Sequence, residues 1–217
     1  MHQGKKYLFI FLTIVLMLLL SACSYFTQPT EETIIDYELI ESEVKNRVSS
    51  GIVTVNDFVF GIIVNKSGNT YKAVAGYNSI GNRSTHKIKD YNSNEYDATL
   101  VKSSESSYLA MFQFTSSSND LTVLQLTQTS PEVISNILTI GSNNAVNFGT
   151  AYEEKFNSSM NAILFSHNAQ STTLNSSSIV FDYDGIVVGI EIASSMLSTN
   201  GRTTRFGVYS SRIRSFL

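Results

Sequence analysis

The most regular feature of the sequence is the alternation, from Gly51 onward, of short apolar runs with polar clusters. The runs are rich in Val, Ile, Phe, Tyr and Thr, which are enriched in strands, and the clusters consist mainly of Asn, Ser and Gly. This pattern is typical of an antiparallel β protein. It predicts strands at 51–55, 58–64, 70–76, 85–91, 96–102, 108–115, 121–126, 136–141, 161–166, 178–182, 185–191 and 205–210.

Turn signals separate these predicted strands. Polar breakers lie at 66–69, 116–120 and 142–144, and Asp184-Gly185 stands between two apolar runs, which is a strong hairpin signal. A dozen short strands in one chain favour two packed barrels or a sandwich. A chain of 217 residues has room for one domain, or for two small ones that share an interface.

The N-terminus has a different pattern. Lys5 and Lys6 precede an apolar run of 14 residues, Tyr7 to Leu20, which is interrupted only by Thr13 and is shorter than the roughly 20 residues of a membrane-spanning helix. The run ends in Leu20-Ser21-Ala22-Cys23, which resembles the lipobox of bacterial lipoproteins. That resemblance implies a signal peptide at 1–22, with cleavage before Cys23, lipid on its sulfur and acylation of the new N-terminus. It implies a chain anchored to the cell membrane by lipid, on the extracytoplasmic side.

A tether follows the lipidated residue. The polar stretch at 24–35 resembles a linker, and apolar residues near helical spacing at 34–48 predict a short helix with a charged, solvated face. We therefore divide the chain into the signal peptide at 1–22, a lipidated tether with a short helix at 23–47, and one domain at 48–217.

The net charge and the cysteine content argue against nucleic-acid binding and against cysteine-based catalysis. The net charge of −3 provides no basic surface for nucleic acid, so we expect no nucleic-acid partner. Cys23 is the only cysteine, so the domain has neither disulfides nor a cysteine nucleophile. His86 and His167 have no cysteine or paired carboxylate nearby in the sequence, and we predict no metal and no cofactor.

The order of segments from Ser49 to Arg214 resembles the protease domain of HtrA-type, trypsin-like serine proteases. Each segment is a weak match alone, but their order and spacing together follow the family. The matching segments are 68–80 (the hairpin that leads to Thr-Asn-x-His-Val), 95–101, 108–112 (Asp-Leu-Ala-Val-Leu), 137–141 (Val-x-Ala-Ile-Gly), 174–179 (Gly-Asn-Ser-Gly-Gly-Pro), 184–190 and 206–210 (Gly-Phe-Ala-Ile-Pro). This resemblance implies an all-β, trypsin-like (chymotrypsin-like) fold of two six-stranded antiparallel barrels, at about 48–116 and 120–210, with a cleft between them.

The resemblance also locates the family's catalytic positions, and most of them have lost the required chemistry. The base position falls on Asn78, whose amide cannot accept a proton near neutral pH, and the orienting acid falls on Tyr108. Ser176 keeps the nucleophile's hydroxyl, but Leu174 stands at the oxyanion-hole glycine and Ser177 replaces a second glycine. Because a triad works as one unit, we expect a pseudoprotease without catalytic residues.

Two histidines remain as possible substitutes for the missing base. The alternation of Thr85-His86-Lys87-Ile88 suggests that His86 points to solvent. His167 falls in a segment that, in the family, approaches the nucleophile and the substrate pocket. A surface or loop role is the simpler interpretation of both histidines, and Asp182 and Asp184 are explained by the turn that they form.

Three functions remain open. The first is a surface lipoprotein that binds an unidentified peptide or protein partner through a degenerate protease cleft. The second is a residual serine hydrolase or peptidase in which His167 activates Ser176, and the third is a purely structural envelope lipoprotein in which Tyr108 and Leu174 fill the barrel junction. The first accounts for both the family resemblance and the missing base.

Overall fold

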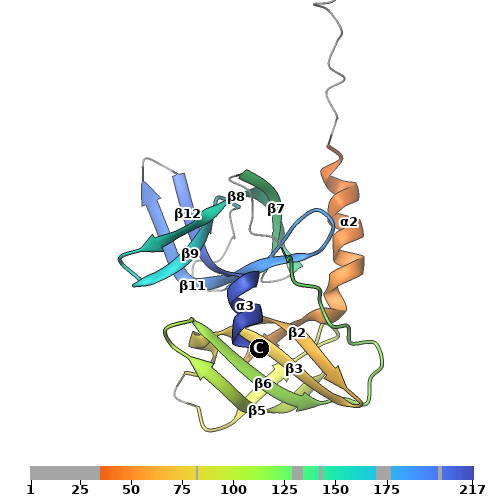
Figure 1. Ribbon diagram of the computed structural model, residues 1–217. Helices are drawn as coiled ribbons and strands as arrows, with labels where there is room; N and C mark the ends of the chain where they lie inside the picture. Colours follow the sequence, from red (N-terminus) through yellow and green to blue (C-terminus); the bar gives the residue numbers. More distant parts are fainter. Residues whose placement is uncertain (1–34, 82, 129–133, 142–143, 170–176, 200–201) are drawn as a thin grey trace, which may run out of the picture. The chain divides into compact units, whose positions relative to one another are not determined.

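In the part of the chain that the structure describes, twelve strands build two separate sheets (Figure 1). The computed structural model describes residues 35–217 apart from 82, 129–133, 142–143, 170–176 and 200–201. The chain divides into two units, Met1–Tyr37 and Glu38–Leu217, and the strands described here belong to the second unit. The predicted signal peptide at 1–22 and the predicted lipidation site Cys23 lie outside the described residues. No helix in the described part is long and apolar enough to cross a membrane.

The first sheet is a six-stranded antiparallel barrel with the spatial order β1-β2-β3-β6-β5-β4. It closes where Val55 of β1 pairs with Ile88 of β4. Most inward positions are apolar, and the cluster inside this barrel includes Ile63, Ala73, Phe112 and other fully buried side chains. Its strands are β1 (Ile52–Val55), β2 (Val59–Ser67), β3 (Thr70–Gly76), β4 (His86–Lys89), β5 (Glu95–Ser104) and β6 (Leu109–Thr115).

The second sheet repeats this arrangement with the order β10-β11-β12-β9-β8-β7, and the pairing of β10 with β7 closes it. The helix α3 (Ser210–Phe216) follows its last strand. Its strands are β7 (Ile134–Ile140), β8 (Val146–Asn157), β9 (Ala162–His167), β10 (Ile179–Phe181), β11 (Val187–Thr199) and β12 (Arg202–Tyr209). The expected fold of two six-stranded antiparallel barrels is therefore confirmed.

The core joins the two barrels. One cluster of buried apolar side chains contains residues of both, among them Ile62 and Val74 of the first barrel and Ile179 and Ile190 of the second.

In the second barrel the ring of Phe165 lies against two glycines, Gly189 and Gly207. A Cβ at Gly207 would stand 2.6 Å from Phe165 Cε1, so a larger residue there would displace the ring.

A helix precedes the first barrel, followed by the short 3₁₀ turn η1 (Ser49–Gly51). The helix α2 (Tyr37–Val48) buries Val44 and Val48, and Arg47 Nη1 donates to the carbonyl of Asp184. Gly185 in the β10–β11 turn adopts a φ of +75°, where glycine is favoured, and it packs closely against the side chain of Val48. The predicted Asp-Gly hairpin thus forms and also provides the surface on which α2 packs.

Two strand expectations need correction. Residues 121–126 were expected to form a strand, but they form an extended connection between the barrels, with only an isolated bridge from Leu126 to Val187. β8 was not expected, because its second half contains Glu153, Glu154 and Lys155 and lacks a clear alternation. Pairing with β7 and β9 supplies its hydrogen bonds, so tertiary context overrides the local pattern.

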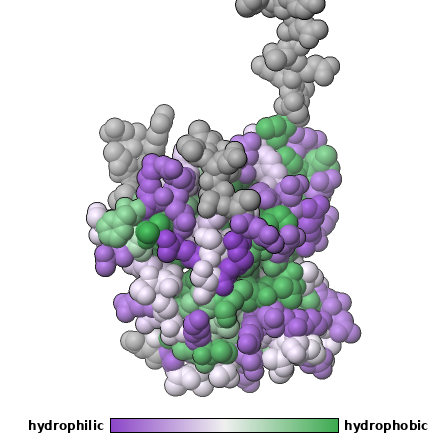
Figure 2. Space-filling view, in the orientation of Figure 1, coloured by the Kyte–Doolittle hydropathy of each residue, from purple (hydrophilic) through white to green (hydrophobic). Residues whose placement is uncertain are grey.

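The surface is mixed in polarity. On the face shown in Figure 2, apolar surface lies on the first barrel beside α3, and polar side chains surround it. The last residue, Leu217, is 51% exposed.

Candidate active site

Asn78, at the predicted base position, lies on the 3₁₀ turn η2 (Tyr77–Ser79), which begins where β3 ends. Its side chain is exposed. The turn is held in place by the Tyr77 amide, which donates to the carbonyl of Tyr108 over 2.8 Å. The η2 turn that carries Asn78 therefore lies next to Tyr108.

Tyr108, at the predicted acid position, takes a left-handed backbone conformation with φ +56° in the turn directly before β6. Its side chain is half-buried, and its hydroxyl donates to the carbonyl of Met160 at 2.5 Å, in the turn between β8 and β9. The Tyr108 hydroxyl is thus a neutral hydrogen-bond donor that links the two barrels. A group that donates to a carbonyl supplies no negative charge to orient an imidazole.

The nucleophile position cannot be placed, since Ser176 and Leu174 both lie outside the described residues. The next residue, Ser177, is fully buried, and its Oγ accepts a hydrogen bond of 2.9 Å from the Phe60 amide in β2. The hydroxyl that replaces a family glycine therefore joins the second barrel to the first. Ser178, which follows Ser177 in the sequence, is also fully buried.

His86 does not point to solvent, which corrects the expectation from the sequence. It is only 5% exposed, and Asn56 Nδ2 lies 3.2 Å from its Nδ1. The same Asn56 amide donates to the carbonyl of Ser79 at 2.6 Å. Since His86 alternates with Lys87 along β4, it shares the inward face with Ile88, which the period of two allows. Burial, followed by the charge of Arg83, lowers the pKa of His86.

His167 is completely buried at the end of β9, and its ring stacks on Phe165 at a centroid distance of 5.8 Å. Its Nε2 lies 3.7 Å from Glu191 Oε2. Burial, followed by the positive charge of Arg205, lowers the pKa of His167 to about 3. An imidazole with so low a pKa is neutral at physiological pH and a weak proton acceptor.

Sequence reasoning missed the two residues that surround this histidine. Glu191 of β11 is fully buried, Arg205 of β12 is 2% exposed, and Arg205 Nη1 donates to Glu191 Oε1 at 2.5 Å. Burial raises the pKa of Glu191, against the opposing effect of the Arg205 guanidinium. A usable signal was present, because Glu191 is a lone charge in the apolar run Val187–Ile192. A charge inside such a strand is rarely buried unless it is paired.

The remaining acidic candidates are structural. Asp182 Oδ1 accepts hydrogen bonds from the amides of Asp184 at 3.0 Å and Ile186 at 2.8 Å, so this carboxylate forms the β10–β11 turn. Within the described ranges, no group of three or more His, Cys, Asp or Glu side chains could hold a metal ion.

Comparison with known families agrees with this geometry. The sequence profile described as "Trypsin-like peptidase domain" matches residues 44–190, which is more than half of the chain and runs from the end of α2 to the start of β11. No curated protein resembles the chain closely enough to count as a match.

Proposed function

The chain belongs to the trypsin-like peptidase domain family, and we propose that it is a member which binds a peptide or protein partner without cleaving it. One observation carries the loss of catalysis: neither histidine of the exported part is available as a general base. The chain has three histidines, and the third, His2, lies in the signal sequence. A histidine base would therefore have to be His86 or His167.

The side chains of both histidines are buried and packed against other residues in the protein interior. His86 is buried beside Asn56, and His167 is buried between Phe165 and Glu191. A general base has to reach the proton of the attacking hydroxyl at a pKa near the working pH. A pKa of about 3 for His167 argues against the alternative in which it activates Ser176.

The other catalytic positions support the same proposal. The exposed Asn78 amide cannot take up a proton, and the Tyr108 hydroxyl is directed to the carbonyl of Met160. Loss of one triad member costs roughly 10⁴- to 10⁶-fold in rate, and further losses add little because the members act together. A free Ser176 hydroxyl alone would leave negligible peptidase activity.

The binding part of the proposal rests on what the chain retains. The two barrels persist, and the η2 turn exposes the polar side chain of Asn78 at the predicted base position. A purely structural envelope lipoprotein is less well supported, because a cavity remains beside Tyr108 instead of a filled junction. We also propose that Cys23 anchors the chain by lipid to the outer face of the cell membrane.

A fluorophosphonate probe tests the loss of catalysis, because it labels only serines whose nucleophilicity is raised. We expect no labelling of the native protein in envelope fractions, while an active serine peptidase added to the same sample is labelled. Labelling that disappears in Ser176→Ala would overturn the proposal.

Chemical cross-linking in the same envelopes tests the binding part: we expect the same cross-linked partner band with the native chain and with Ser176→Ala.

Lipidation is tested by feeding cells an alkyne fatty acid. We expect the native chain to incorporate the label and to sediment with membranes, and Cys23→Ala to lose the label and retain an uncleaved signal. Multiple acyl chains give stable anchoring, whereas a single one is marginal. As a control, Ser24→Ala leaves the cysteine in place and keeps the label. Equal labelling of Cys23→Ala would contradict the anchor.

A further inference from the structure

A cavity of about 330 Å³ lies between the β5–β6 turn, β9, β12 and α3. This volume is at the lower end of the range for small-molecule sites. Of the two described positions predicted for the base and the acid, the cavity includes Tyr108 but not Asn78. The inference names a small ligand for this cavity, which goes beyond the proposed function, and its test does not depend on the partner.

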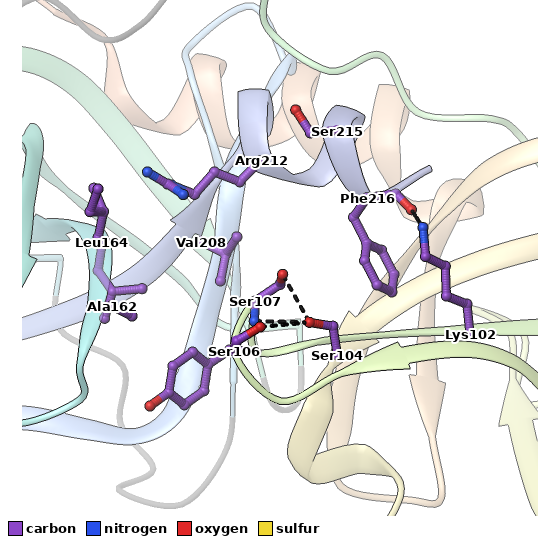
Figure 3. A pocket seen from close by; sticks show the side chains of 12 residues that line it. Lys102, Ser104, Ser106, Ser107, Ala162, Leu164, Val208, Arg212, Ser215 and Phe216 are labelled. Atoms are coloured by element: carbon purple, nitrogen blue, oxygen red, sulfur yellow. Dashed lines mark hydrogen bonds between the residues drawn. The ribbon is translucent and has the colours of Figure 1, made fainter.

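The polar lining of the cavity consists of hydrogen-bond donors and hydroxyl groups. Figure 3 shows Arg212 on one side of the cavity and Lys102, with Phe216, on the other, and serines lie between them. No carboxylate is found among the residues that line it. An occupant that complements two cations and several hydroxyls has to offer negatively charged oxygen atoms.

The two cations are held in position by the protein. Arg212 Nε donates to Glu154 Oε1 at 3.0 Å, and Glu154 is largely buried at 19% exposure. This pairing uses one edge of the guanidinium, and the terminal nitrogens have no partner among the described residues. Lys102 Nζ donates to the carbonyl of Phe216 at 2.7 Å and lies 4.7 Å from the centre of its ring. Each contact orients a cation, and each leaves further N–H groups available to a ligand.

The serines form a hydrogen-bonded group at the β5–β6 turn. Ser104 Oγ lies 3.1 Å from Ser106 Oγ and 3.0 Å from Ser107 Oγ, and the Ser107 amide donates to Ser104 Oγ at 3.2 Å. These contacts fix the positions of three hydroxyls that face one cavity. Three hydroxyls held in one place lower the entropy cost of binding an oxyanion.

The apolar part of the lining comes mainly from the second barrel and α3, and Tyr108 and Ser215 complete the lining. Ala162, Leu164 and Val208 are buried, and the ring of Phe216 closes the side next to Lys102 (Figure 3). We infer that this cavity binds a small organic anion, a carboxylate or phosphate monoester that carries a short apolar or aromatic group. The oxyanion is held by Arg212, Lys102 and the serines, and the apolar group lies against Leu164 and Val208.

Calorimetric titration of the full-length protein in a neutral detergent tests this inference. The probes are phenyl phosphate, benzoate and benzyl alcohol, which share one ring size and differ in charge. We expect at least one of the two anions to bind with a stoichiometry near one, and benzyl alcohol to bind about tenfold or more weakly. Binding by phenyl phosphate alone would identify a phosphate monoester, and binding by benzoate alone would identify a carboxylate.

Substitutions on the two sides of the cavity test whether the anion binds in this cavity or elsewhere on the protein. Arg212→Gln and Lys102→Gln are each expected to weaken binding of the anion about tenfold. Lys155→Gln, which removes an exposed lysine outside the lining, serves as the matched control and should leave the affinity unchanged. Thermal melting of each variant checks that the fold is intact. No binding of either anion, or equal loss in Lys155→Gln, would overturn the inference.

Discussion

Glu191→Ala is expected to lower the free energy of unfolding by about 3–5 kcal/mol. The substitution leaves the Arg205 guanidinium, which is 2% exposed, without the carboxylate that it contacts at 2.5 Å. A buried cation that loses a counter-charge keeps its desolvation cost without the compensating attraction. Equilibrium urea unfolding at neutral pH, followed by circular dichroism, measures the change.

The control for this prediction is Glu153→Ala. Glu153 pairs with Lys155 at 2.7 Å on an exposed stretch of β8, so its loss should cost less than about 1 kcal/mol. The double variant Glu191→Leu with Arg205→Met removes both charges and should recover much of the lost stability, because no unpaired charge remains. A cost for Glu191→Ala no larger than that of Glu153→Ala would show that the pair is not buried in solution.

The stability of the folded protein should fall as the pH is lowered from about 6.5 toward 5, and His167 should be the main cause. The pKa of His167 is about 3 in the folded protein against 6.5 in the unfolded chain. The unfolded chain therefore binds a proton in this window that the folded protein does not bind. At 1.36 kcal/mol per pH unit, His167 accounts for about 2 kcal/mol between pH 6.5 and pH 5.

Glu191 acts in the opposite direction on acidification. Burial raises its pKa above 4.5, so the folded protein takes up this proton before the unfolded chain does, which stabilises the fold as the pH falls toward 4.5. The measurement is therefore the difference in pH dependence between the native chain and His167→Phe, from urea unfolding at pH 7 and pH 5. His167→Phe should lose about 2 kcal/mol less on acidification than the native chain. His86→Gln should retain most of the native pH dependence, and a His167→Phe profile parallel to the native one would contradict the prediction.

The alternation of apolar and polar residues was sufficient to predict most of the strands. It worked best where each strand has one inward face, as in β3 and β6, whose apolar side chains meet inside the first barrel. It failed at 121–126, where Leu124 and Leu126 are apolar but the backbone pairs only briefly with Ile63 and Val187. It also assigned the wrong face to His86, although Ile88 in the same register indicates an inward position.

By itself, the sequence determined the class of fold, since this follows from residue type and the order of segments along one chain, and the assignment of the base and acid positions to Asn78 and Tyr108 stays a prediction from the same order. Only the tertiary structure decided where the remaining charges lie. Glu191, Arg205 and His167 come from three strands, and their contact arises because β11, β12 and β9 are neighbours in a closed barrel. A pKa depends on burial and on charges close in space, and neither is encoded in the spacing of residues along the chain.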